Sequence, residues 1–381
     1  MEPKSIVMVA GEPSGDLHAA HLIHAIKARY GPIFVCGMGG RAMRAAGAKV
    51  LIDADQVAVV GITEVLAKAA QVLKAMGQLK RLLAGLKPDL LILIDFPDFN
   101  LHLAAIAKKM GIPVLYYISP QLWAWRAGRV KKIKKRVDHM AVILPFEKQF
   151  YEAHQVPVTF VGHPLMDSAT GRVQFREDPM ELPSAPVVGL FPGSRDREVA
   201  SLLPVMLQAA GQLRQNLESV RFIVSCAASI DPASIQAVAQ NAEAAPLEIS
   251  HEPVSQIFPK CHLAVVASGT VTLEAAICGT PMIITYMVSP MSYWLGRALI
   301  RVDHIGLVNL IAQERIVPEL VQNEVTPEAI CQAAQAILAD VKSYNTVRGN
   351  LRLVRERLGA AGASEKVAEI ALSLTEKGHA V

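Results

Sequence analysis

Three glycine-containing segments lie where a predicted β-strand is followed by a predicted helix. They are residues 9–16 (Val-Ala-Gly-Glu-Pro-Ser-Gly-Asp), residues 192–195 (Pro-Gly-Ser-Arg) and residues 268–270 (Ser-Gly-Thr). Glycine lets the main chain approach a ligand closely, and the N-terminus of a helix attracts anions. None of the segments has the Gly-X-Gly-X-X-Gly or P-loop pattern, so nicotinamide and ATP sites lose their main support. The segments predict sites for a phosphate-bearing ligand, although an ordinary strand–helix turn uses the same residue types.

The second and third segments add side chains that suit a nucleotide. Arg195 supplies a guanidinium fork beside main-chain amides, which fits a diphosphate. Glu274 lies one turn into the helix that follows the third segment, where its carboxylate could accept hydrogen bonds from ribose hydroxyls. The ligand-binding residues predicted from the three segments are Gly11, Ser14, Gly15, Gly193, Ser194, Arg195, Ser268, Gly269, Thr270 and Glu274.

Asp95 directly follows an apolar run at residues 90–94. A carboxylate at the carboxyl end of a central strand points into the ligand cleft, and partial burial raises its pKa into the range of a general base. We therefore predict Asp95 as the base, with a structural role as the alternative. Asp98, three residues further on, could instead cap the next helix.

A basic segment with two tryptophans stands out from an otherwise mildly charged chain. Aromatic residues mixed with lysine and arginine suit anionic lipid headgroups. The alternative is a solvated basic helix that carries one packed tryptophan. The predicted membrane-facing residues are Trp123, Trp125, Arg126, Arg129, Lys131 and Lys132.

The composition excludes several classes of protein. The chain has 381 residues, of which 52% are hydrophobic and 19% charged, so it is not a disordered protein. The mean hydropathy of +0.31 is high, but the apolar runs are short and no membrane-spanning helix is expected. A net charge of +4 does not by itself indicate nucleic acid. The five cysteines are scattered and form no Cys-X-X-Cys pair, which argues against disulfides or a zinc site.

Predicted strands and helices alternate along most of the chain. Short apolar runs between helical segments indicate parallel, doubly wound sheets of the Rossmann type, and the pattern restarts near Pro186. We predict an α/β protein with two such domains and a ligand cleft between them. The expected boundaries are residues 1–166, residues 167–345, and C-terminal helices at 346–381 that could pack back on the first domain.

Several motifs together resemble those of the lipid-A-disaccharide synthase family over nearly the whole chain. The more specific ones are Asp95 with Pro-Asp-Phe-Asn at 97–100 and Trp-Ala-Trp-Arg at 123–126. The glycine segments, Leu-Pro-Phe-Glu at 144–147, Gly-His at 162–163 and Asn-Leu at 309–310 add to the resemblance. One departure is Pro13, where some relatives have threonine.

The resemblance implies a GT-B glycosyltransferase that joins UDP-2,3-diacylglucosamine to 2,3-diacylglucosamine 1-phosphate with inversion and releases UDP. It implies catalytic roles for Asp95, Glu12 and Asn309, and UDP binding by Arg195 and the glycine segments. No metal and no cofactor are expected. The acylated substrates imply a cytoplasmic protein that associates peripherally with the anionic inner-membrane surface, and they allow a homodimer but no nucleic-acid partner.

Two other functions remain open at this point. A UDP-N-acetylglucosamine 2-epimerase would have the same architecture and similar glycine segments, but it would need no acceptor. A non-catalytic protein that binds a nucleotide sugar or an anionic lipid would not need the carboxylate of Asp95.

Overall fold

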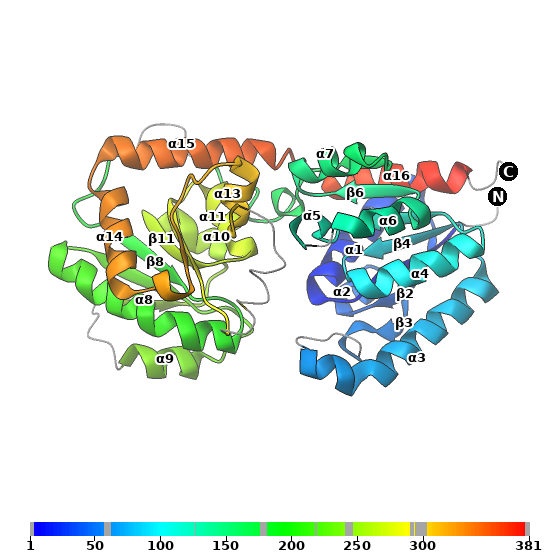
Figure 1. Cartoon of the computed structure of the whole chain (residues 1–381), viewed down its shortest axis with the longest axis horizontal. Coiled ribbons are helices and arrows are strands. Elements are labelled where there is room, and N and C mark those ends of the chain that lie inside the picture. The colour runs from blue at the N-terminus through cyan, green and yellow to red at the C-terminus, as the bar shows by residue number, and fades with distance from the viewer. Residues whose placement is uncertain are drawn as a thin grey trace. The chain divides into compact units, whose positions relative to one another are not determined.

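The chain forms two compact units, each built around its own sheet. The computed structural model describes residues 4–56, 62–125, 127–175, 181–217, 219–240, 247–289, 293 and 303–377. Unit 1 comprises Met1–Pro164 and Ala360–Val381, and unit 2 comprises Leu165–Gly359 (Figure 1).

Unit 1 contains a seven-stranded sheet in which every neighbouring pair is parallel, in the order β3-β2-β1-β4-β5-β6-β7. Its strands are β1 (Ser5–Ala10), β2 (Phe34–Gly39), β3 (Lys49–Asp53), β4 (Leu90–Ile94), β5 (Val114–Tyr117), β6 (His139–Val142) and β7 (Val158–Phe160). Its helices are α1 (Pro13–Tyr30), α2 (Arg41–Ala45), α3 (Ile62–Leu86), α4 (Pro97–Lys109), α5 (Leu122–Trp125), α6 (Val130–Arg136), α7 (Pro145–Ala153) and α16 (Ala363–Lys377).

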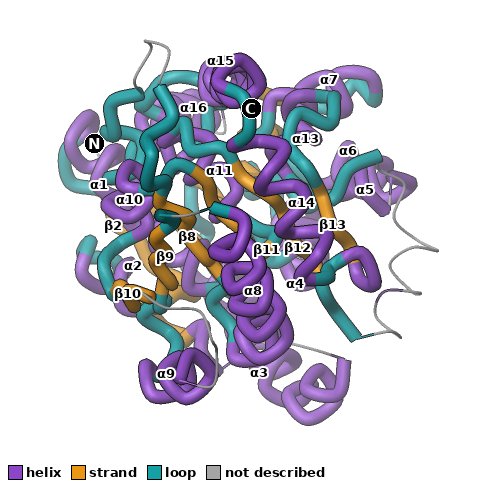
Figure 2. Tube along the Cα trace, turned by 90° about the vertical axis from the view of Figure 1, so that its left-hand side faces the viewer, coloured by secondary structure: helices purple, strands orange, loops and turns teal. Residues whose placement is uncertain are grey.

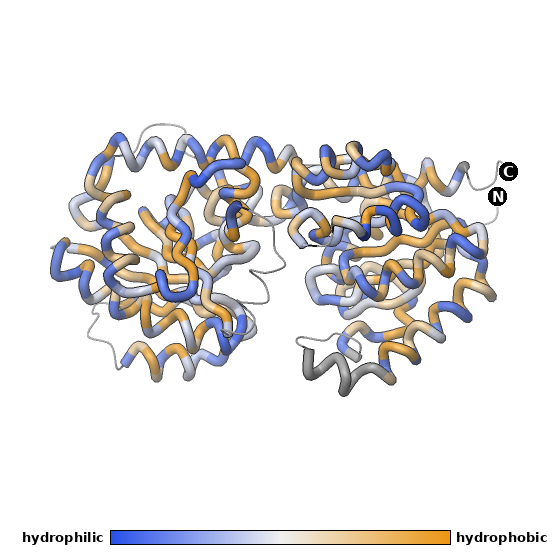
Figure 3. The backbone as a smooth tube through the Cα atoms, viewed as in Figure 1, coloured by the Kyte–Doolittle hydropathy of each residue, from blue (hydrophilic) through white to orange (hydrophobic). Residues whose placement is uncertain are grey.

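Both faces of this sheet are covered by helices. In β1, Val7 and Val9 pack in one apolar cluster with α3 and α4, whereas Ile6 and Met8 pack in a second cluster with α1 and α16. A strand buried on both faces needs apolar residues at every position, which explains the continuous apolar runs. Figure 3 shows the strands of both units as mostly hydrophobic.

Unit 2 contains a six-stranded parallel sheet in the order β10-β9-β8-β11-β12-β13. Its strands are β8 (Val187–Phe191), β9 (Arg221–Ser225), β10 (Leu247–Ser250), β11 (Leu263–Ala267), β12 (Met282–Tyr286) and β13 (Glu319–Val321). Its helices are α8 (Asp196–Asn216), α9 (Pro232–Gln240), α10 (Val254–Ile257), α11 (Thr270–Cys278), α13 (Leu307–Ala312), α14 (Pro327–Leu338) and α15 (Val341–Arg357). Helices α8 and α14 pack together against this sheet, and Figure 2 shows α8 in front of β8 and β11.

The C-terminal helices are shared between the two units. Helix α15 belongs to unit 2, whereas α16 packs on α1 and β4 of unit 1. The stretch predicted as one C-terminal piece from residue 346 is therefore divided after Gly359. The other crossing between the units follows Pro164, close to the predicted boundary at residue 166.

Both sheets have one point at which the strand order reverses. In unit 1 this switch lies between β1 and β4, and in unit 2 it lies between β8 and β11. Ligands of doubly wound sheets bind outside the carboxyl ends of the strands at such a switch. A ligand site is therefore expected at the residues that follow these four strands.

Candidate active site

A pocket of about 340 Å³ lies at the switch point of unit 2. The loops after β8 and β11 form its walls, and Ser225 and Val254 add to the lining. All seven residues predicted for ligand binding in this unit line the pocket: Gly193, Ser194, Arg195, Ser268, Gly269, Thr270 and Glu274. Two separate sequence segments thus meet in one cavity because their strands are neighbours in the sheet.

The loop after β8 presents donors that can hold an anion. The main-chain N–H of Ser194 donates to Glu198 Oε2 at 3.0 Å, and Arg195 Nη1 donates to Glu198 Oε1 at 2.7 Å. Gly193 has a φ of 113°, and a Cβ there would lie 2.3 Å from the Glu198 carboxylate, so only glycine fits. The carboxylate of Glu198 thus accepts hydrogen bonds from an amide and a guanidinium, which are the donors that a phosphate group would use.

Glu274 is a mostly buried acid in the wall of this pocket. Burial raises its pKa to about 7, and a hydrogen bond from the Thr170 hydroxyl, 3.3 Å from Glu274 Oε1, opposes that rise. A carboxylate with one weak partner in a pocket wall keeps acceptor capacity for the hydroxyl groups of a ligand.

The switch point of unit 1 brings together the loops that follow β1 and β4. A Cβ at Gly11 would lie 2.4 Å from the Phe96 ring, so the close contact of the two loops requires glycine at that position. Asp95, at the end of β4, is mostly buried, and burial together with the nearby charge of Glu12 raises its pKa to about 6. A carboxylate with that pKa is ionised at neutral pH and still basic enough to accept a proton.

Other residues of the first glycine segment have different surroundings. Gly15 is buried at the start of α1, and Ser14 is exposed there. Gly11, Ser14 and Gly15 all belong to unit 1, and none of them lines the pocket of unit 2. Asp16 caps α2, because its carboxylate accepts the main-chain N–H groups of Gly40, Ala42 and Met43.

Asn309, expected as a catalytic residue, has no exposed surface. Its Nδ2 donates to Glu319 Oε1 at 2.7 Å and to the Val317 carbonyl at 2.9 Å, and its Oδ1 accepts the N–H groups of residues 316 and 317. Every hydrogen-bonding group of this amide is used within unit 2. The side chain fixes the start of α13 against β13 and does not line the pocket formed by the loops after β8 and β11, and its expected catalytic role stays a prediction.

The first tryptophan of the basic segment makes its contacts within unit 1. The indole N–H of Trp123 donates to the buried carboxylate of Glu147 at 3.1 Å, and its ring packs edge-on against Phe146. Burial raises the pKa of Glu147 to about 7, whereas hydrogen bonds from Leu144 and Trp123 lower it. Trp123 is thus partly buried and anchored within unit 1 by these contacts, and its membrane-facing role stays a prediction.

The remaining residues of this segment divide into paired and exposed groups. Arg129 pairs with Asp98 at 2.5 Å. In α6, Val130 and Ile133 are buried, whereas Lys131, Lys132, Lys134 and Lys135 are exposed. Trp125 is 41% exposed, and Arg126 lies outside the described residues.

The described parts of the chain hold no cluster of His, Cys, Asp and Glu side chains that could bind a metal ion. The sequence contains Asp-Ala-Asp at residues 53–55, a pattern that can bind cations. In the structure, however, Asp53 pairs with Arg44 at 2.7 Å, and this hydrogen bond lowers the pKa of its carboxyl group. Among the described helices, none is long and apolar enough to span a membrane.

Two features of the unit 1 site were not predicted as functional. Tyr116, in β5, and Asn100, in α4, both donate hydrogen bonds to the main-chain carbonyl of Asp95. Asn100 falls within a motif of the sequence, but no pattern marks Tyr116 apart from its place near the end of a buried strand.

Two solved structures match the fold of this chain at low sequence identity. UDP-GlcNAc 2-epimerase from Neisseria meningitidis has a TM-score of 0.62 at 12% identity, covering 97% of this chain and 100% of that one. The calicheamicin glycosyltransferase CalG4 has a TM-score of 0.63 at 14% identity, covering 100% of both chains. At such identities the likeness shows the fold alone, which is the two-domain Rossmann-like GT-B fold.

Sequence relatives are much closer. The family model described as Lipid-A-disaccharide synthetase matches residues 6–371. A lipid-A-disaccharide synthase of Geobacter metallireducens is 47% identical over 379 residues, which cover 98% of each chain. A lipid-A-disaccharide synthase of Coxiella burnetii is 42% identical over 377 residues, covering 98% of this chain and 99% of the relative. The chain therefore belongs to the lipid-A-disaccharide synthase family.

Proposed function

We propose that this protein transfers the sugar of UDP-2,3-diacylglucosamine to the 6-hydroxyl of 2,3-diacylglucosamine 1-phosphate, forming a β-1,6-linked disaccharide and UDP. The observation that carries this proposal within the family is Asp95. It is a mostly buried carboxylate at the switch point of unit 1, with a pKa raised to about 6 by burial and by Glu12. Such a group suits the deprotonation of a hydroxyl at neutral pH.

In the proposed reaction the oxygen of the acceptor 6-hydroxyl attacks the anomeric carbon of the donor. The carboxylate of Asp95 takes the proton of that hydroxyl. The bond between that carbon and the UDP oxygen breaks, and UDP leaves with the bonding electron pair. Direct displacement inverts an α-linked donor to a β-linked product. Glu12 contributes by keeping the carboxylate of Asp95 basic.

The pocket of unit 2 suits the leaving group. The guanidinium of Arg195, the amide N–H of Ser194 and the start of α11 would meet the charge that develops on the diphosphate. The side chain of Glu274 would accept hydrogen bonds from ribose. In the structure the guanidinium of Arg195 and the amide N–H of Ser194 both donate to the carboxylate of Glu198. A bound diphosphate would replace that carboxylate as the acceptor of these two hydrogen bonds.

The test is acceptor-dependent release of UDP. Purified protein is incubated with UDP-2,3-diacylglucosamine, with and without the diacylated 1-phosphate acceptor, in buffer that contains EDTA because we propose a reaction without a metal. We expect UDP and disaccharide only when both substrates are present. Epimerisation of UDP-N-acetylglucosamine without an acceptor, or binding without any turnover, would instead favour one of the two alternative functions.

We also propose that the exposed lysines of α6 bring the protein to the anionic, cytoplasmic face of the inner membrane. Lys131, Lys132, Lys134 and Lys135 are exposed on a helix whose apolar side chains face the core of unit 1. Each basic residue near an anionic surface adds about 1 kcal/mol to binding. This peripheral contact would give access to substrates whose acyl chains lie in the bilayer.

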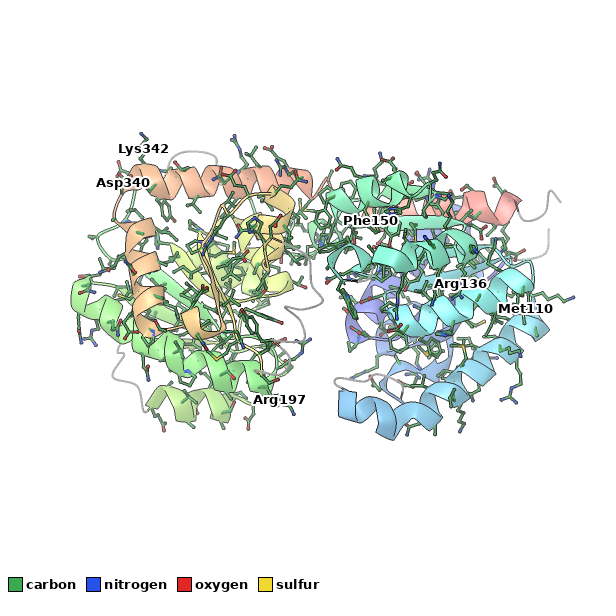
Figure 4. The ribbon with its side chains drawn as sticks, in the orientation of Figure 1. Met110, Arg136, Phe150, Arg197, Asp340 and Lys342 are labelled. Carbon is green, nitrogen blue, oxygen red and sulfur yellow. The ribbon has the colours of Figure 1, made fainter. Side chains whose placement is uncertain are left out.

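Charge reversal at these four lysines is expected to release the protein from anionic vesicles. In flotation with vesicles of phosphatidylglycerol and phosphatidylcholine, the Lys→Glu variant should lose at least about tenfold in bound fraction. The matched control reverses four exposed lysines elsewhere, which are Lys49, Lys109, Lys342 (labelled in Figure 4) and Lys366. Equal flotation of the α6 variant and the native protein would refute the proposed membrane face.

A further inference from the structure

Two fully buried side chains hold the main-chain carbonyl of Asp95. The Tyr116 hydroxyl donates to this oxygen at 2.6 Å, and Asn100 Nδ2 donates to it at 2.7 Å. Asn100 Nδ2 also lies 3.3 Å from the carbonyl oxygen of Ile94, the last residue of β4. Both side chains have no exposed surface, so neither reaches a ligand.

The main chain at Asp95 needs this support because of its conformation. Asp95 and Phe96 both have a φ of 47°, in the left-handed region that residues other than glycine rarely adopt. Two consecutive residues of this kind persist only where their surroundings hold them. The N–H of Asp95 donates to the Tyr117 carbonyl at 3.2 Å, so both polar groups of its main chain are tied to β5.

Both side chains act as donors toward the main chain at Asp95. Among the described residues, Asn100 Oδ1 is buried and accepts no hydrogen bond, a cost that the structure tolerates while Nδ2 serves Ile94 and Asp95. Burial, and next the charge of Asp95, raise the pKa of Tyr116 well above its ordinary value. The Tyr116 hydroxyl therefore keeps its proton and remains a donor.

We propose that Tyr116 and Asn100 are positioning residues, which fix the left-handed turn at Asp95 and thereby set where its carboxylate lies relative to Glu12 and to the acceptor hydroxyl. The proposal rests on the proposed function, because it assumes that Asp95 is the base. Displacing a reacting group by about 1 Å can cost a hundredfold in rate, so loss of one support should be visible in turnover.

Tyr116→Phe tests this proposal with the loss of a single oxygen atom. We expect kcat to fall by about tenfold or more, while the KM for the donor and the Kd for UDP stay within about twofold. The acid limb of the pH–rate profile should also move, because the burial of the carboxylate and its distance from Glu12 both change. Asn100→Ala removes the other donor and should show the same separation of kcat from KM.

Tyr151→Phe is the matched control for a purely structural loss. Tyr151 is a fully buried tyrosine of unit 1 whose hydroxyl lies 2.7 Å from Ser119 Oγ. We expect Tyr151→Phe to lower the melting temperature about as much as Tyr116→Phe does. It should leave kcat and the acid limb of the pH–rate profile unchanged. If both variants lower kcat equally, or if Tyr116→Phe retains native turnover with the native acid limb, the positioning role is wrong.

Combining Tyr116→Phe with Asp95→Asn separates this proposal from the proposed function. If Asp95 is the base and Tyr116 acts through it, the hydroxyl has nothing left to position, and the double variant should turn over no more slowly than Asp95→Asn alone. Native turnover by Asp95→Asn would instead overturn the base assignment itself. An inactive Asp95→Asn together with a fully active Tyr116→Phe would overturn only the positioning role.

Discussion

Replacing Asp95 with asparagine is expected to abolish most of the acceptor-dependent release of UDP. The amide has nearly the same shape as the carboxylate but cannot take a proton, and a general base contributes about a hundredfold to ten-thousandfold to a rate. We therefore expect kcat to fall by roughly that factor. Initial rates of UDP release under saturating substrates measure the effect.

Binding of UDP provides the control for this variant. The pocket that we assign to UDP lies within unit 2, whereas Asp95 belongs to unit 1, so calorimetry should give the Asp95→Asn protein a native Kd for UDP. A variant that keeps native turnover would remove Asp95 as the base. A variant that loses UDP binding together with turnover would show that the substitution acts through the structure.

Replacing Arg195 with alanine is expected to act on binding. Arg195 lines the unit 2 pocket, and its guanidinium and the neighbouring amide of Ser194 are the donors that we assign to the diphosphate. A hydrogen bond to a charged group contributes about 1.5–3 kcal/mol, which corresponds to roughly a tenfold to hundredfold rise in the Kd for UDP. Titration calorimetry with UDP measures this change directly.

Two neighbouring variants make the Arg195 result specific. Arg197→Ala removes an exposed arginine two residues further on (Figure 4), which does not line the pocket, and should leave the Kd unchanged. Glu198→Gln removes the negative charge that competes for the same donors, so the Kd should fall by roughly fivefold. Unchanged UDP affinity in Arg195→Ala would refute the diphosphate role.

The central strands could be predicted from the sequence because each of them is a continuous run of apolar residues. Residues 90–94 and 263–267 are buried on both faces, and this leaves an unbroken apolar run. The strands β3, β7 and β13 are harder to predict, because they lie at sheet edges and are only partly buried, so their residues mix polar and apolar types. The unit 2 pocket was predictable because its two loops follow strands that are neighbours at the switch point.

Other side-chain contacts could not be predicted, because they depend on residues that are distant in the sequence or on the local conformation of the main chain. The indole of Trp123 donates to the buried carboxylate of Glu147, a partner that the residues around Trp123 in the sequence do not indicate. The amide of Asn309 is held by Glu319 and by the main chain at residues 316–317, and no local pattern around Asn309 indicates these partners. The left-handed turn at Asp95 involves no glycine, so no local pattern indicates that Tyr116 and Asn100 must support it.

The pH dependence of kcat/KM, measured for the native protein and for Glu12→Gln, tests most directly whether Asp95 is a base whose pKa is raised by burial and by Glu12. The carboxylate must be ionised to act, so the native rate should fall as the pH drops through about 6. Removing the charge of Glu12 takes away the second cause of the raised pKa, and the acid limb should move to lower pH. A native limb near the ordinary carboxyl value of about 4, or a limb that Glu12→Gln leaves in place, would contradict the assignment.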